Sequence, residues 1–202
     1  MKRRHFVAQA AAISIATVAM GVPVGVQAQA NTVKVGLILS MTGPFASTGK
    51  QIEAGARLYM AQHGDTVAGK KIELVIKDDA SAPDQSKRVA QELVVNDKVQ
   101  VLGGFVLTPL ALAAAPVATQ GKTPTVVMVA ATSSVIDASP YFIRSSFTLP
   151  QVTVGVAEWA PKNGIKNVVS LVSDYGPGFV PEGGVKQRLE QSGGKGASAI
   201  RV

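Results

Sequence analysis

Residues 33–44 read VKVGLILSMTGP. Its first eight residues are mostly aliphatic, and a run of turn residues follows them directly. A short apolar run bounded by turn residues predicts a buried strand of the kind found in parallel sheets. Residues 48–63 come next and predict a helix, which the glycine at position 64 ends.

Stretches typical of strands and of helices alternate along the rest of the sequence. We expect further strands at residues 71–76, 99–102, 124–129, 140–144, 167–172 and 197–202, and further helices at residues 81–96, 108–120, 150–163 and 179–192. Such alternation implies parallel strands joined by right-handed crossovers. The sequence therefore predicts an α/β protein with a parallel sheet and helices on both faces.

The loops at the carboxyl ends of these strands are the expected place for a ligand. In open parallel sheets, ligands bind at that edge. The loops are rich in Ser, Thr and Gly, which offer hydroxyl and backbone N–H donors to an anion. They are residues 40–49, 78–84, 103–109, 129–134 and 173–178.

Residues 1–30 have the pattern of a secretory signal peptide. A basic start precedes an apolar run over residues 6–20, and residues 28–30 read AQA, which is a small-x-small cleavage site. The adjacent Arg3 and Arg4 also fit a twin-arginine signal. We therefore expect export by the Sec or the twin-arginine route. An uncleaved membrane anchor is the less favoured alternative, because the apolar run is short.

The composition excludes several classes of function. The 202 residues are 47% hydrophobic and 16% charged, which is typical of a globular protein. They include no Cys, so disulfides and thiolate metal sites are excluded. Three of the 20 basic residues and no acidic residue lie in positions 1–30, so the net charge falls from +7 to +4 for the remainder. The other Lys and Arg residues are scattered, and we expect no nucleic-acid binding.

No catalytic set of residues emerges from the sequence. The glycines of residues 193–196 lack the spacing of a phosphate loop, and no nucleophile elbow or zinc-protease motif is present. Asp78 and Asp79 are adjacent on a strand and point to opposite faces, so a structural role is favoured over a metal site or an acid/base pair. His63 is typical of a helix end. We expect no enzyme, no metal and no cofactor.

Five segments of the sequence resemble one known family in order and spacing. The family is the branched-chain-amino-acid type of periplasmic binding protein, of fold type I. The segments are residues 35–44 (VGLILSMTGP), 71–79 (KIELVIKDD), 115–118 (APVA), 130–133 (AATS) and 173–176 (SDYG). No single motif is decisive, but the five together cover essentially the whole chain after residue 30.

The resemblance implies a periplasmic protein whose two α/β lobes close over a ligand. Residues 31–147 would form a first lobe and residues 148–202 the start of a second, both incomplete because members of the family are considerably longer. The implied partners are a small-molecule ligand, either an amino acid or an aromatic or aliphatic carboxylate, and the permease of an ABC importer. The protein would be a monomer. A ligand-sensing domain of the same fold, an enzyme and a non-binding truncated fragment stay open as alternatives.

Carried over by position, the resemblance implies six ligand-binding residues. They are Thr48, Leu107, Thr108, Ala130, Thr132 and Tyr175. The family often has an aromatic residue at the position of Thr48 and a Ser at the position of Leu107. These differences favour another amino acid, or a carboxylate without an amino group such as an aromatic acid, over leucine.

Three of these positions also fit plainer roles. Thr108 precedes Pro109, so it fits a helix N-cap as well as a contact to a ligand carboxylate at the helix N-terminus. The two roles are compatible. Residues 130–134 fit a polar turn after a strand, and Tyr175 fits an exposed aromatic residue in a loop.

Overall fold

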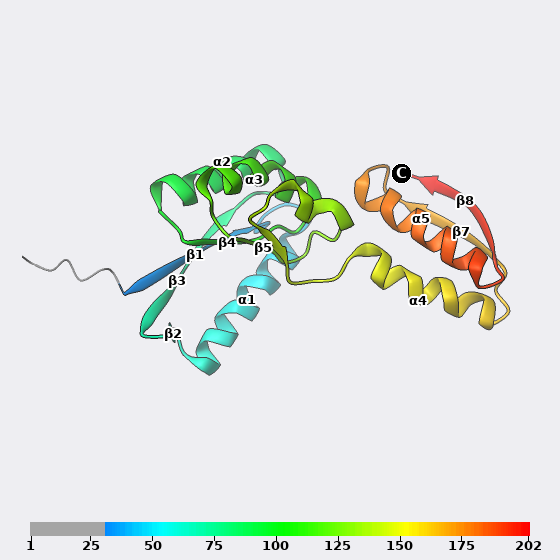
Figure 1. Cartoon of the computed structure of the whole chain (residues 1–202), viewed down its shortest axis with the longest axis horizontal. Coiled ribbons are helices and arrows are strands. Elements are labelled where there is room, and N and C mark those ends of the chain that lie inside the picture. The colour runs from blue at the N-terminus through cyan, green and yellow to red at the C-terminus, as the bar shows by residue number, and fades with distance from the viewer. Residues whose placement is uncertain (1–30) are drawn as a thin grey trace, which may run out of the picture. The chain divides into compact units, whose positions relative to one another are not determined.

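The computed structural model describes residues 31–202 as alternating strands and helices (Figure 1). The strands are β1 (Thr32–Leu39), β2 (Thr66–Val67), β3 (Lys70–Asp78), β4 (Val101–Gly104), β5 (Thr125–Val127), β6 (Phe142–Arg144), β7 (Asn167–Val172) and β8 (Lys195–Arg201). The helices are α1 (Ala46–His63), α2 (Pro83–Gln91), the π-helix η1 (Glu92–Asn96), α3 (Thr108–Gly121), the 3₁₀-helix η2 (Ser133–Ala138), α4 (Leu149–Lys162) and α5 (Gly176–Gln191). The predicted signal peptide lies outside the described residues.

Residues 31–202 form two sheets, and both are built mainly from parallel strands. The first has the order β2-β3-β1-β4-β5-β6, and the second pairs β7 with β8. All pairs are parallel except β2 with β3. The predicted α/β class with a parallel sheet is confirmed. The predicted lobe boundary between residues 147 and 148 falls in the connection from β6 to α4, and the division into two lobes stays a prediction.

The main core lies between the first sheet and the pair α2 and α3. Leu37, Ile38 and Leu39 of β1 are at most 1% exposed, because β1 is flanked by β3 and β4 and covered by helices. Figure 1 shows α2 and α3 on one face of this sheet and α1 on the other. Ser86, at 0% exposed, donates from its hydroxyl to the Leu110 carbonyl and so ties α2 to α3.

The second sheet has a much smaller core. Its fully buried apolar side chains are Ala157 and Ala160 of α4 and Leu189 of α5. The β7 residues Val169 and Leu171 remain 62% and 69% exposed. This part of the chain therefore gains less from burial of apolar surface than the first sheet does.

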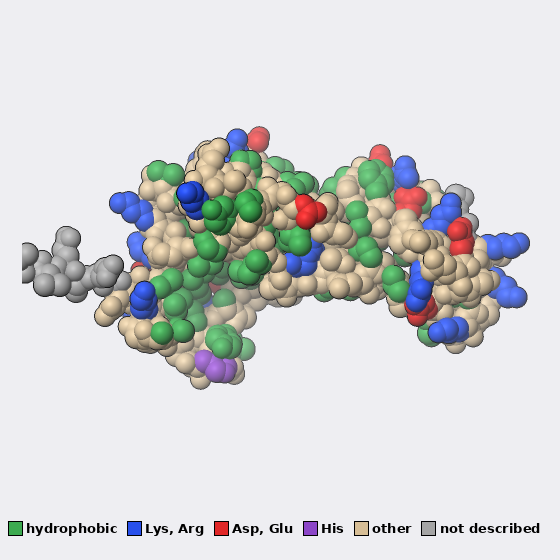
Figure 2. All heavy atoms as spheres, in the orientation of Figure 1, with side chains coloured by type: hydrophobic (Ala, Val, Ile, Leu, Met, Phe, Trp, Pro, Cys, Tyr) green, Lys and Arg blue, Asp and Glu red, His purple; other side chains and the backbone are tan. Residues whose placement is uncertain are grey.

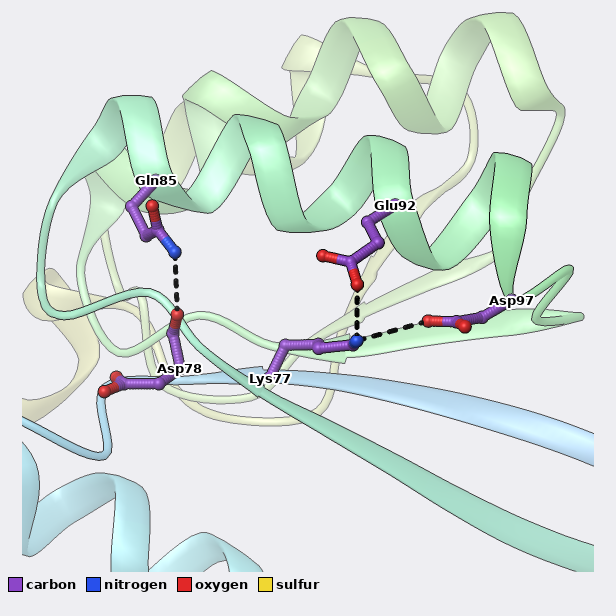
Figure 3. A network of polar contacts seen from close by, with 5 residues as sticks. All are labelled: Lys77, Asp78, Gln85, Glu92 and Asp97. Carbon is purple, nitrogen blue, oxygen red and sulfur yellow. Dashed lines mark hydrogen bonds and ion pairs between the residues drawn. The ribbon is translucent and has the colours of Figure 1, made fainter.

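The π-helix η1 brings two carboxylates to one lysine. Lys77 of β3 lies 2.6 Å from Glu92 Oε1 and 3.6 Å from Asp97 Oδ2 (Figure 3). The wider π turn places residues five apart on the same side, and the Asp97 N–H accordingly donates to the Glu92 carbonyl. The hydrogen bond to Glu92 raises the pKa of Lys77, and burial opposes this only in part. The sequence predicted a single regular helix here and missed the π turn.

Three further features differ from the sequence-based prediction. The strand β2 was missed because two residues are too short to show a periodicity. The 3₁₀-helix η2 was missed within a stretch interpreted as a polar loop, where the Val135 N–H donates to the Thr132 carbonyl. The helix α5 begins at Gly176, inside a predicted turn, because Pro177 suits the first turn of a helix.

The charged side chains are dispersed over the surface. Figure 2 shows Lys and Arg scattered among Asp and Glu on the face that it presents. In the part of the chain that the structure describes, no helix has the length and apolarity needed to cross a membrane.

Candidate ligand-binding site

A cavity of about 240 Å³ lies where the carboxyl ends of several strands meet. Four segments line it: the β4–α3 loop, the segment after β5, the connection from β6 to α4, and the β7–α5 loop. The lining residues are Val106, Leu107, Thr108, Val129, Ala130, Ala131, Phe147, Leu149, Tyr175 and Pro177. The cavity therefore occupies the edge of the sheet where a ligand is expected.

Two buried hydroxyl groups meet at this cavity. The Thr108 and Thr132 Oγ1 atoms lie 2.8 Å apart, and the two residues are 6% and 7% exposed. One of the two hydroxyl hydrogens lies between the oxygens, so the other is available to a ligand. The N-cap of α3 is Leu107, whose side chain makes no capping bond, and Thr108 is the first helical residue. The alternative that Thr108 is an N-cap was therefore wrong.

The N-terminus of α3 offers one backbone donor at the same place. The N–H groups of Leu110 and Ala111 donate to the Leu107 carbonyl, and Pro109 has no N–H. The Thr108 N–H is the remaining donor of the first turn. A helix N-terminus carries a partial positive charge, so this end of the cavity favours an anion.

A loop held by an arginine forms the next wall. The Ala130 N–H donates to the Phe105 carbonyl at 3.0 Å, which anchors the loop to the end of β4. Arg144, the last residue of β6, donates from both Nη atoms to carbonyl oxygens of this loop and of the segment before α4. The sequence reasoning did not single out Arg144. In the sequence, Arg144 stands out only as a basic residue at the end of a short predicted strand.

The remaining walls are apolar and aromatic. Tyr175 is the N-cap residue of α5 and is 37% exposed, while Phe147 is 50% exposed. Both residues border the cavity, together with Val106 and Leu149. No residue that lines the cavity is a carboxylate. Sequence reasoning missed Phe147, because it lies in a connection with no periodic pattern.

The six predicted site residues fall into three groups. Leu107, Thr108, Ala130 and Tyr175 line the cavity. Thr132 contacts it through the Thr108 hydroxyl. Thr48 lies in the first turn of α1 and does not line the cavity. A role of these residues in binding stays a prediction.

Asp78 and Asp79 have structural contacts, as the sequence favoured. The Asp78 carboxylate accepts from the Met41 N–H at 2.8 Å and from the Thr42 hydroxyl at 2.6 Å. Burial alone would raise the pKa of Asp78, but these bonds and those from other N–H groups outweigh it and lower the pKa. Asp79 is 0% exposed and accepts from the Ser40 hydroxyl at 2.8 Å. Burial raises the pKa of Asp79, which the hydrogen bonds offset only in part.

Metal ligands do not gather anywhere in residues 31–202. No group of three His, Asp or Glu side chains there is close enough to hold an ion. The expectations that the protein has no metal, no cofactor and no catalytic residue stay predictions.

Comparison with known proteins identifies the family. Residues 32–202 match the family described as "Periplasmic binding protein". The chain belongs to this family. Its resemblance to the branched-chain-amino-acid type is confirmed by the "Leu/Ile/Val-binding protein homolog 6" of Brucella abortus, 48% identical over 176 residues. That match covers 87% of this chain and 45% of the relative.

Solved structures of this family agree in fold. An ABC-transporter solute-binding protein of Rhodopseudomonas palustris BisB5, in complex with 3,4-dihydroxybenzoic acid, is 56% identical with a TM-score of 0.83. One from R. palustris HaA2, in complex with p-hydroxybenzoic acid, is 47% identical with a TM-score of 0.82. Each match covers 85% of this chain and 47% of the other. The chain therefore spans about half the length of the relatives that it matches.

Proposed function

We propose that this periplasmic binding protein is the ligand-binding component of an ABC importer, and that its ligand is a hydroxy-substituted aromatic carboxylate. The cavity next to Thr108 carries the proposal. Hydroxyl and N–H donors stand at one end of it, and apolar and aromatic side chains form its walls. This arrangement suits a carboxylate attached to a flat ring.

The size and the charges of the cavity support this ligand class. A volume of about 240 Å³ is below the range of roughly 300–1,000 Å³ that is usual for drug-sized ligands, so a small molecule fits. The polar groups that residues 31–202 place at the cavity are hydroxyl and N–H donors, which suit a carboxylate. Two relatives of 56% and 47% identity hold hydroxybenzoates, which is the same chemistry.

The protein would act in the periplasm as a monomer that binds its ligand without converting it. The bound ligand would stabilise one conformation, and permease subunits in the inner membrane would recognise that conformation. A branched-chain amino acid is the second candidate, because a relative of 48% identity is named as a Leu/Ile/Val-binding homologue.

Thermal unfolding with a panel of ligands tests the proposal. The panel contains 4-hydroxybenzoate, 3,4-dihydroxybenzoate, benzoate, leucine and valine. A ligand present at a hundred times its dissociation constant adds about 2.7 kcal/mol to the stability of the folded state. We expect the two hydroxybenzoates to raise the melting temperature and the amino acids to leave it unchanged.

Each other outcome points to a different function. A shift with leucine or valine alone would favour the amino-acid candidate. Chemical change of a bound ligand would indicate an enzyme. A cooperative melt that no compound moves would mean that this chain by itself does not bind, and binding without recognition by a permease would favour a sensor.

A further inference from the structure

The Arg144 guanidinium donates its hydrogen bonds to backbone carbonyls of the segments that form the cavity wall. Its Nη1 atom donates to the carbonyls of Ala130 at 3.1 Å and Phe147 at 3.2 Å. Its Nη2 atom donates to the carbonyls of Thr132 at 2.6 Å and Ser133 at 3.2 Å. Four carbonyls from two segments thus converge on one guanidinium.

These bonds determine which way the peptide groups of the loop face. The C=O and N–H of a trans peptide point in opposite directions. Because the Ala130 carbonyl faces Arg144, the Ala131 N–H points away from the guanidinium. The Ala131 carbonyl accepts from the Leu149 N–H at 2.9 Å, so the Thr132 N–H points away from Leu149.

Two N–H groups of this loop, those of Ala131 and Thr132, have no acceptor among residues 31–202. Ala130 and Ala131 line the cavity, next to Thr108. Protein atoms therefore satisfy the carbonyls of Ala130, Ala131, Thr132 and Ser133, and the N–H groups of Ala131 and Thr132 remain for a ligand.

The charge of Arg144 is not neutralised by a carboxylate. No Asp or Glu among the described residues lies within 4.0 Å of its guanidinium. A guanidinium stays protonated in proteins. One positive charge therefore stands on the carbonyl side of the loop.

We propose that Arg144 is a positioning residue that makes the cavity select a carboxylate over a neutral group. It turns the Ala131 N–H toward the ligand, and it places a positive charge on the opposite, carbonyl side of the same peptide group. The proposal rests on the proposed function, because it takes the ligand to be a carboxylate. Arg144 itself does not line the cavity, so it acts through the loop.

Calorimetric titration of the full chain with 4-hydroxybenzoate and with its neutral analogue 4-hydroxybenzamide tests this role. We expect Arg144→Gln to weaken binding of the carboxylate by about tenfold or more, since it removes charged hydrogen bonds. We expect it to weaken binding of the amide by less than about threefold, since an amide does not need the charge. Arg144→Lys keeps the charge and should bind the carboxylate more tightly than Arg144→Gln does.

Arg57→Gln is the matched control. It removes the same charge from an exposed helix position, where Arg57 pairs with Glu53 at 2.8 Å. It should bind both compounds as the wild type does. Circular dichroism of each variant monitors folding. Should Arg144→Gln not fold, Arg144→Lys tests the positioning part of the role, because lysine keeps the charge but lacks the planar guanidinium that holds four carbonyls. A weaker preference for the carboxylate over the amide than in the wild type is then expected, and an unchanged preference would contradict that part.

Several results would overturn the proposal. An equal loss for both compounds would assign Arg144 a purely structural role, and wild-type affinity in both Arg144 variants would assign it none. Binding of leucine in place of hydroxybenzoate would contradict the proposed ligand only, and the Arg144 variants would then be compared on leucine and leucinamide. A wild-type chain that binds no carboxylate at all would contradict both proposals.

Discussion

The hydroxyl oxygens of Thr108 and Thr132 lie 2.8 Å apart and join the N-terminus of α3 to the loop after β5. Both side chains are buried, so each hydroxyl depends on the other for a partner within the protein. The pair thus serves two purposes. It holds two walls of the cavity together, and it leaves one hydroxyl hydrogen for a ligand.

Replacing Thr108 by Val should therefore reduce both stability and ligand affinity. The change keeps the shape of the side chain but leaves the Thr132 hydroxyl without its partner. We expect the free energy of unfolding to fall by about 1 kcal/mol and the dissociation constant for 4-hydroxybenzoate to rise by about tenfold. Urea unfolding and calorimetric titration measure the two effects.

Thr119→Val separates these effects. The Thr119 hydroxyl lies 2.8 Å from Ser139 Oγ and 2.9 Å from the Ala115 carbonyl, on a more exposed part of α3 that does not line the cavity. This variant should lose stability and keep its affinity. Equal affinity in Thr108→Val and the wild type would show that the Thr108 hydroxyl does not meet the ligand.

Two glycines near the starts of α1 and α5 have no room for a side chain. A Cβ atom on Gly49 would lie against the backbone carbonyl of Ser40, and one on Gly178 against that of Ser173, both far inside van der Waals contact. Each helix must shift to accommodate an alanine there. We expect Gly49→Ala and Gly178→Ala to lower the free energy of unfolding by more than about 1 kcal/mol.

The same helices offer matched controls. A Cβ on Gly55 of α1 or Gly183 of α5 would meet no atom within 4 Å. Alanine at these positions should stabilise the protein by roughly 0.5–1 kcal/mol, because glycine is a poor helix former. Urea midpoints of the four variants test both expectations. A loss of stability in Gly55→Ala would contradict the open surroundings of this glycine in the interior of α1.

The alternation of strands and helices was predictable because most of the longer elements carry a recognisable set of apolar residues bounded by turn residues. The stretch around Leu37 shows this best, since a run with no polar interruption is needed only where a strand is covered on both faces. The short elements β2 and η2 carry no such pattern, because they hold few residues and bury little. The π turn has no signal of its own in the sequence, and Lys77, which Glu92 contacts, is 15 residues away.

The loops that form the candidate site were predictable from the sequence, but the contacts that hold these loops in place were not. Ser, Thr and Gly after a strand indicated the loops that offer donors, and the resemblance to the family singled out Thr108 and Thr132 within them. Arg144 gains its role from carbonyls that lie 11 to 14 residues earlier. Backbone carbonyls are present at every position, so no pattern of residue types shows which of them converge on one guanidinium.

The ion pairs of Lys77 link β3 to η1, and their contribution to the free energy of unfolding should decrease as the salt concentration rises. Lys77→Met leaves the neighbouring carboxylates of Glu92 and Asp97 without their cation. We expect a lower urea midpoint, with a difference from the wild type that shrinks at high NaCl because partly exposed charges are screened. A double-mutant cycle with Glu92→Gln measures the coupling, and additive effects of the two changes would show that the pair contributes nothing.

Because of Asp79, the free energy of unfolding should fall as the pH rises above the ordinary pKa of an aspartate carboxyl group. Burial raises its pKa above the ordinary value of 3.8, the bonds from Ser40 and Ser81 oppose this, and the charge of Asp78 adds to it. Between the two pKa values the folded state binds more protons than the unfolded state. The contribution of Asp79 to the free energy of unfolding is thus lost as pH rises from about 4 through its raised pKa.

Asp79→Asn tests this linkage, because asparagine keeps an oxygen for the Ser40 hydroxyl but does not titrate. We expect the stability of the variant relative to the wild type to improve from about pH 4 to pH 7. Asp78→Asn should behave in the opposite way. The pKa of Asp78 is lowered, so its contribution is present above the ordinary pKa and lost as pH falls below it. Urea unfolding at a series of pH values measures both, with the exposed Asp137→Asn as control. A constant difference between Asp79→Asn and the wild type would show that Asp79 has no raised pKa.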